Sequence, residues 1–149
     1  MAPPLLTVDA CVWVAAFEPA DALHPAARAF LIECQRRHVP LASPTIALLE
    51  TGCAISRRFG SPEKGRRAAR LWATNPLLHL MPVDAELEAH ALELGTALRL
   101  RAADALYAAL AARLDADLLT TDGELLDRTA GYVRASTPAR WLEAHAERP

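Results

Sequence analysis

The sequence has none of the features that mark a secreted, membrane-spanning or disulfide-bonded protein. Its first residues lack the basic start of a signal peptide, and no apolar run approaches the length of a membrane span. The three cysteines, Cys11, Cys34 and Cys53, are an odd number without metal-like spacing. Because all three lie in apolar segments, we expect reduced cysteines in the core of a cytoplasmic protein with no membrane contact.

The chain also lacks internal repeats, low-complexity segments and a strong net charge. Its formal net charge at pH 7 is −2, which gives no global signature of a nucleic-acid-binding protein. Positive charge is nevertheless concentrated in one short span that contains a single acid. The basic members of this span are Arg57, Arg58, Lys64, Arg66, Arg67 and Arg70. Such a cluster is most often a solvated helix face, and a phosphate-binding surface is the functional alternative.

What the sequence does contain predicts one globular domain over residues 1–149. Hydrophobic residues make up 52% of the chain and charged residues 23%, a composition that allows a substantial core. Five short apolar segments are predicted strands, at residues 5–8, 39–42, 77–83, 117–120 and 132–135. Helical segments between them predict a three-layer α/β/α domain with a mostly parallel five-stranded sheet.

Capping signals set the expected ends of several helices. The first helix follows Asp9, and the second ends near residue 37. Ser43 and Pro44 are predicted to begin the third helix, which ends at Gly60. Further helices are expected at residues 62–74, 84–98, 102–114 and 123–129, and from residue 138 onward.

Two acids are expected at the carboxyl ends of strands. Asp9 follows an apolar strand and precedes a helix, and Asp122 comes two residues after Thr120, at the end of another strand. In open α/β sheets this rim is where ligands bind. Capping the following helix is the alternative role for each of these carboxylates.

Two further acids are expected on helices. Glu50 is the only charged residue between residues 46 and 55, so we expect a buried helix whose carboxylate needs an arginine, a metal or a proton. Asp104 begins an alanine-rich helix that allows close packing, although a first-turn acid also stabilises the helix dipole. Four converging carboxylates repel one another unless a cation holds them, and oxygen-only ligation favours Mg²⁺ or Mn²⁺.

At these positions the sequence resembles the PIN-domain nucleases, and at this length the toxin subunits of VapBC toxin–antitoxin pairs. The resemblance covers nearly the whole chain and rests on four motifs in order. They are Val8-Asp9, the helix from Ser43-Pro44 to Glu50, the segment from Asp104 to Ala111, and Leu119-Thr120-Thr121-Asp122. One departure is Cys11, which stands where the family often has serine or asparagine.

The resemblance implies a Mg²⁺- or Mn²⁺-dependent endoribonuclease in which water attacks phosphorus in line. The implied catalytic and metal-binding residues are Asp9, Glu50, Asp104 and Asp122, supported by Thr120. It also implies a homodimer and a small antitoxin whose tail enters the site. Candidates for RNA binding are Arg57, Arg58, Arg66, Arg67, Arg99 and Arg101; the last two could equally pair with acids.

Two alternatives belong to other functional classes. A phosphoacceptor receiver domain also gathers acids at strand ends, but it needs a lysine after a late strand, and the only lysine is Lys64. A catalytically inactive PIN-like module that binds RNA or a partner stays open, because a thiol at Cys11 replaces the usual hydroxyl or amide. A metal-dependent nuclease assay with an EDTA control separates these alternatives.

Overall fold

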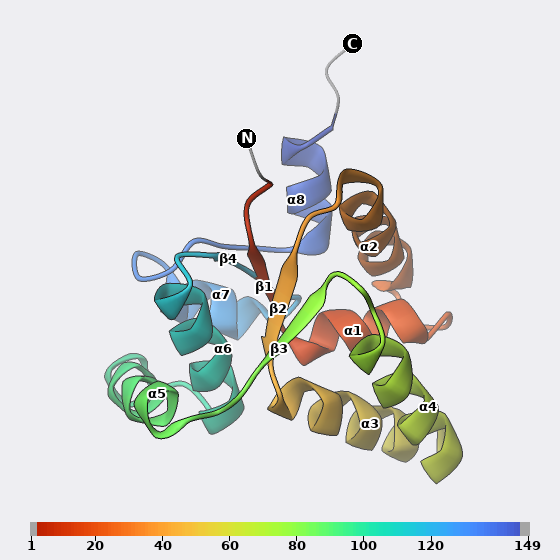
Figure 1. Ribbon diagram of the computed structural model, residues 1–149, viewed down its shortest axis with the longest axis horizontal. Coiled ribbons are helices and arrows are strands. Elements are labelled where there is room, and N and C mark those ends of the chain that lie inside the picture. Colours follow the sequence, from red (N-terminus) through yellow and green to blue (C-terminus); the bar gives the residue numbers. More distant parts are fainter. Residues whose placement is uncertain (1–2, 147–149) are drawn as a thin grey trace.

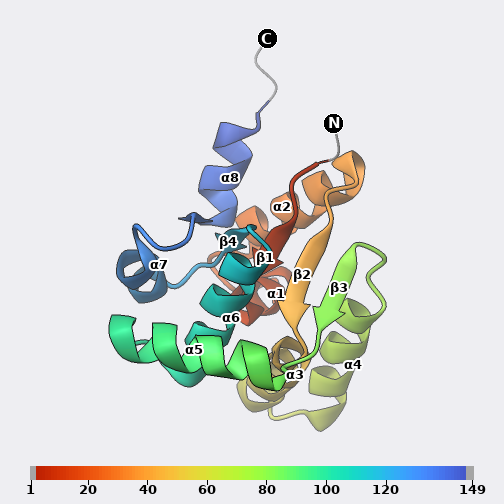
Figure 2. The same cartoon turned by 60° about the vertical axis from the view of Figure 1, so that its left-hand side comes forward.

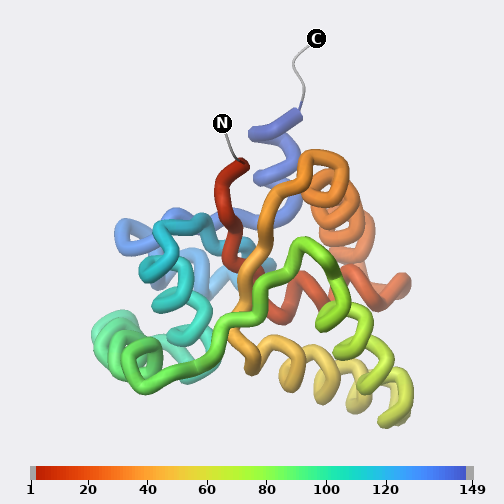
Figure 3. Tube along the Cα trace, in the orientation of Figure 1, coloured from red at the N-terminus to blue at the C-terminus, as the bar shows by residue number. Residues whose placement is uncertain are grey.

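The computed structural model describes residues 3–146 and is built on a five-stranded sheet. The strands lie in the order β3-β2-β1-β4-β5, and every neighbouring pair is parallel. Their bounds are β1 (Leu6–Val8), β2 (Leu41–Pro44), β3 (Leu78–Met81), β4 (Asp117–Leu119) and β5 (Ala135–Ser136). Figure 3 shows β1 and β4, which are far apart in sequence, meeting at the centre of the molecule.

Helices cover both faces of this sheet, which confirms the predicted three-layer α/β/α architecture. They are α1 (Ala10–Phe17), α2 (His24–Arg37), α3 (Ile46–Phe59), α4 (Pro62–Ala73), α5 (Ala85–Leu98), α6 (Ala102–Arg113), α7 (Gly123–Thr129) and α8 (Pro138–Ala144). Figures 1 and 2 show α1, α2 and α4 on one side of the strands and α5 and α6 on the other. No helix in residues 3–146 is long and apolar enough to cross a membrane.

The core lies against the central strand, β1, whose residues are all buried. The ring of Trp13 on α1 packs on that of Trp72 on α4 with 5.0 Å between centroids. Phe30 on α2 and Trp141 on α8 make an edge-to-face contact at 5.1 Å. Because a parallel sheet is covered on both faces, its central strands β1 and β2 are buried along their whole length.

The prediction that Ser43 and Pro44 begin a helix was wrong, because both residues belong to β2. The Ser43 hydroxyl donates to the carbonyl oxygen of Val8 at 2.6 Å and accepts the indole N–H of Trp13 at 3.2 Å. These buried partners occupy the hydroxyl that would otherwise cap a helix. Helix α3 therefore begins at Ile46, without a side-chain cap.

Three other sequence predictions need correction. Helix α3 is not buried all round, since Leu49 is 65% exposed and Cys53 is also exposed. Cys53 is therefore not a core residue, whereas Cys34 is fully buried. Strand β5 begins at Ala135, because the chain makes a turn through Gly131 in the left-handed region before it enters the sheet.

Candidate active site

Asp9 lies where β1 ends and α1 begins, at the centre of the sheet's carboxyl rim. Its backbone N–H donates to the carbonyl of Leu119 at 2.9 Å, so the end of β4 holds it in place. One carboxylate oxygen accepts the Thr120 hydroxyl at 2.7 Å, and the other accepts the Cys11 N–H at 3.4 Å as a helix cap. Only 6% of Asp9 is exposed, and this burial raises the pKa of its carboxyl.

Thr120 and Cys11 tie the loop after β4 to α1. The Thr120 oxygen accepts the N–H of Asp122 at 3.0 Å, and it lies 3.4 Å from the Cys11 sulfur. That sulfur in turn accepts the N–H of Thr121 at 3.3 Å. Burial raises the pKa of the Cys11 thiol to about 12, so it stays neutral. Cys11 thus positions the loop through its sulfur, and its backbone N–H donates to the Asp9 carboxylate.

Glu50 projects from α3 toward the same rim, where Tyr107 of α6 holds it. The buried Tyr107 hydroxyl donates to Oε1 of Glu50 at 2.6 Å. Burial and the negative charges of Asp9 and Asp104 raise the pKa of Glu50, and the tyrosine hydrogen bond opposes them. The sequence pattern alone gave Tyr107 no functional role, although its position three residues after Asp104 places both on one helix face.

Asp104 and Asp122 complete the group and share one arginine. Asp104 lies in the first turn of α6, and Arg101 contacts its Oδ2 through Nε at 3.2 Å. Nη2 of the same guanidinium contacts Oδ2 of Asp122 at 3.0 Å. The other oxygen of Asp122 accepts backbone N–H groups of Glu124 and Leu125, so Asp122 also caps α7. Burial and the Asp9 charge raise the pKa of Asp104 in spite of Arg101.

The four acids line one cavity of about 620 Å³, with Thr120 behind Asp9. Three of the six arginines proposed from sequence also line it: Arg57, Arg58 and Arg101. Arg58 is paired with Asp21 across the cavity at 3.1 Å. The other three lie elsewhere. Arg66 and Arg67 are exposed on α4, and Arg99 ends α5 and lines a separate groove between α5 and α6.

The donor atoms of this cavity suit a hard divalent cation. Asp9, Glu50, Asp104 and Asp122 offer only carboxylate oxygens, the ligand type that Mg²⁺ and Mn²⁺ prefer. The charge of Asp9 raises the pKa of Asp104, and the charges of both raise the pKa of Glu50. In residues 3–146, no three His, Cys, Asp or Glu side chains are grouped tightly enough to hold an ion as they stand. Arg101 is paired with two of these four carboxylates.

In metal-free protein, Asp9, Glu50 and Asp104 should each destabilise the fold less on mild acidification, because their carboxyls have raised pKa values. For such a group ionisation penalises the folded state, and the penalty fades as pH falls through the folded pKa toward the unfolded value near about 4. In EDTA, Asp9→Asn should therefore melt higher than the wild type at pH 7, and the difference should shrink toward pH 5. Melting curves across this range measure it.

Asp84 provides a control of opposite sign. Its hydrogen bonds from Arg113 lower the pKa of its carboxyl. Asp84→Asn should therefore melt lower than the wild type at pH 7, and this deficit should fade only as pH falls below the ordinary carboxyl range. If Asp9→Asn also melted lower at pH 7, the idea that Asp9 is an unfavourable buried charge would be wrong.

Comparison with known proteins identifies the family and the fold. The family model described as PIN domain matches residues 6–132, while no curated protein matches the chain. Mycobacterium tuberculosis VapC20, a sarcin–ricin loop cleaving toxin, aligns with a TM-score of 0.71 and 22% identity, covering 86% of this chain and 96% of VapC20.

Two complexes contain chains of the same fold. A chain of Rickettsia felis VapBC2 bound to promoter DNA aligns with a TM-score of 0.69 and 17% identity, covering 89% of this chain and 98% of that one. A chain of a Klebsiella pneumoniae toxin–antitoxin complex aligns with a TM-score of 0.64 and 16% identity, covering 89% and 97%. Since the family model spans most of the sequence, this chain belongs to the PIN domain family.

Proposed function

We propose that this protein is a Mg²⁺- or Mn²⁺-dependent endoribonuclease, the toxin of a type II toxin–antitoxin pair that acts in the cytoplasm. The observation that carries the proposal is the convergence of Asp9, Glu50, Asp104 and Asp122 on one cavity. These acids come from four separate segments, and local capping accounts for only two of them, Asp9 and Asp122. Glu50, a half-buried residue in the interior of α3 held by a tyrosine, has no capping role.

Asp9, Glu50 and Asp104 would hold the cation, with Asp122 at the edge of the group. A bound Mg²⁺ or Mn²⁺ supplies a Lewis acid that polarises a phosphate oxygen and lowers the pKa of water. Thr120 orients Asp9 through Oδ2, and Tyr107 orients Glu50 through Oε1, so these hydrogen bonds would hold the two carboxylates in position for a cation. In-line attack by water would leave a 5′-phosphate and a 3′-hydroxyl.

The arginines at the cavity are the proposed contacts for RNA phosphates. Leaving the four acids out of the formal charge of −2 makes the remaining surface positive. Arg57 lines the cavity and needs no rearrangement to meet a phosphate, whereas Arg58 must first leave Asp21. Arg66 and Arg67 are exposed on α4 and do not line this cavity, so they would contact RNA outside it.

The solved structures support the proposed partners. VapC20 is a toxin that cleaves the sarcin–ricin loop, and the Klebsiella pneumoniae chain comes from a toxin–antitoxin complex. We therefore propose a cognate antitoxin that covers this cavity, and a homodimer as the assembly. The alternative is a PIN domain that binds RNA or a partner without cleaving it.

A cleavage assay tests the proposal. The purified protein, incubated with total RNA and Mn²⁺ or Mg²⁺, should produce fragments with 5′-phosphates, detected by their sensitivity to a 5′-phosphate-dependent exonuclease. EDTA should stop cleavage, and excess Mn²⁺ should restore it. RNA that binds without being cut under both metals would favour the inactive module instead.

Tyr107→Phe should weaken Mn²⁺ binding by about tenfold, because the Glu50 carboxylate loses the donor that orients it. The phenyl ring keeps the packing of the buried side chain, so the fold should persist. Isothermal titration with Mn²⁺ measures the change in affinity, and circular dichroism checks the fold. Unchanged affinity in a folded variant would show that Tyr107 only fills space beside Glu50.

A further inference from the structure

We propose that Arg101 is a built-in counter-ion of the site, which competes with the metal ion for Asp104 and Asp122. This inference rests on the proposed function, since it assigns the cation to the same carboxylates. One guanidinium joins two acids from different elements, α6 and the start of α7. In the described part of the chain, no other cationic side chain pairs with any of the four acids.

Arg101 occupies the oxygens that a cation would need. On Asp122, Oδ1 accepts two backbone N–H groups that begin α7, which leaves Oδ2 as the oxygen that can face a ligand. Arg101 binds that Oδ2 and also Oδ2 of Asp104. Asp9 and Glu50 accept only neutral donors, from Thr120, Cys11 and Tyr107. Arg101 therefore competes with a cation directly at Asp104 and Asp122, and only through its charge at Asp9 and Glu50.

The contact of Arg101 is easily displaced. Its side chain is 73% exposed, so it reaches the acids from solvent and is not held by packing. Ion pairs of such exposed side chains are weak and screened by salt, and a guanidinium does not lose its proton near neutral pH. The side chain must therefore swing away when a divalent cation binds, and the cation must overcome these two contacts. The result is a site whose negative charge is offset in part without metal, and which binds metal less tightly than its acids alone would.

Arg101→Gln should therefore bind Mn²⁺ more tightly than the wild type, by about three- to tenfold for the loss of two exposed ion pairs. Isothermal titration with Mn²⁺ measures the affinity, and the rise in melting temperature on adding Mn²⁺ should also be larger in this variant. Arg101→Lys keeps the charge but cannot bridge both acids with one planar fork, so its affinity should be intermediate.

Arg113→Gln is the matched control. Arg113 also contacts two acids, Asp84 and Glu86, but it lies outside the cavity of the four acids. This variant should melt slightly lower without metal and bind Mn²⁺ as the wild type does. In addition, diamagnetic Mg²⁺ should shift the NMR signal of the Arg101 Nε–H, identified by its loss in Arg101→Gln.

The outcomes separate this inference from the function on which it rests. If the wild type binds Mn²⁺ and Arg101→Gln binds it equally or more weakly, Arg101 forms only ordinary surface ion pairs. The inference is then overturned, while the proposed metal site stands. If neither the wild type nor the variant binds Mn²⁺ or Mg²⁺, the proposed metal site falls and the inference with it. Tighter binding in Arg101→Gln together with an unchanged Arg113→Gln supports it.

Discussion

Replacing Asp9 with asparagine should lower the rate of Mn²⁺-dependent RNA cleavage by at least about 100-fold, since a metal ion supplies several kcal/mol of charge stabilisation. Asp9 is the central and most buried carboxylate of the group. Asparagine keeps its shape and can still cap α1, so the loss should come from the missing charge and not from unfolding. Initial rates on a defined RNA, with excess Mn²⁺, measure the effect.

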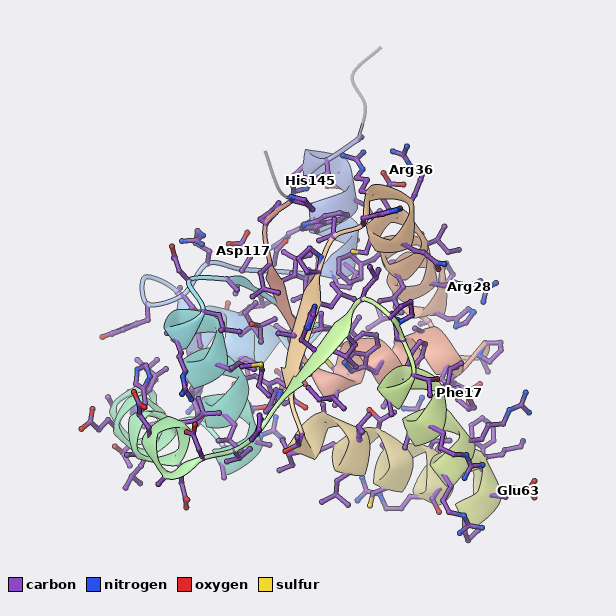
Figure 4. All side chains as sticks on the ribbon, viewed as in Figure 1. Phe17, Arg28, Arg36, Glu63, Asp117 and His145 are labelled. Atoms are coloured by element: carbon purple, nitrogen blue, oxygen red, sulfur yellow. The ribbon has the colours of Figure 1, made fainter. Side chains whose placement is uncertain are left out.

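The same loss is expected for Glu50→Gln and Asp104→Asn, and a smaller one for Asp122→Asn at the edge of the site. Asp117→Asn is the control, because Asp117 begins β4 and lies at the opposite end of the strands from α3, as Figure 4 shows. This variant should cleave RNA at the wild-type rate. Wild-type rates for folded Asp9→Asn, Glu50→Gln and Asp104→Asn alike would refute the catalytic assignment.

Gly65→Ala should reduce the free energy of unfolding by about 2 kcal/mol, the balance of an overpacking cost near 3 kcal/mol and a helix-propensity gain near 1 kcal/mol. Gly65 lies where α4 crosses α3, the two helices that form a hairpin in Figure 2. A Cβ atom there would overlap the backbone oxygen of Gly52 and lie 2.9 Å from the Cβ of Ser56. Because the first of these contacts is to backbone, the helices themselves must move apart. Urea titration measures the loss.

Gly52→Ala is the matched comparison on the facing helix. A Cβ atom at Gly52 would be 3.4 Å from the Gly65 oxygen and 3.6 Å from the Ala69 Cβ, which is ordinary contact. Higher helix propensity should then leave this variant as stable as the wild type or slightly more so. Equal stability of the two alanine variants would show that α3 and α4 separate without cost.

The Gly65 contact also bears on the site, because α3 carries Glu50. Gly65→Ala should therefore weaken Mn²⁺ binding even under conditions in which the variant stays folded. The sequence offered no sign of this dependence. Glycines thirteen residues apart, in two consecutive helices, reveal a close approach only after the hairpin has formed.

Local patterns were enough for most of the architecture. Apolar strands alternating with helices predicted the parallel sheet, and Gly60 ends α3 in the left-handed conformation as expected. The misplaced start of α3 shows the limit of such signals. Ser43 followed by Pro44 is a good local signal for a helix start. In the structure, however, the serine hydroxyl accepts the buried indole N–H of Trp13 and donates to the carbonyl of Val8.

By itself the sequence determined that Asp9 and Asp122 follow strands and that Glu50 and Asp104 lie in helices, because these are properties of neighbouring residues. Their roles as ligands remain predictions. Only the tertiary structure decided which side chains meet. Tyr107 reaches Glu50 from 57 positions away, Thr120 reaches Asp9 from 111, and Arg101 bridges Asp104 and Asp122. Such partnerships depend on how the strands are ordered and how the helices cross the rim, and no local period in the chain encodes those distances.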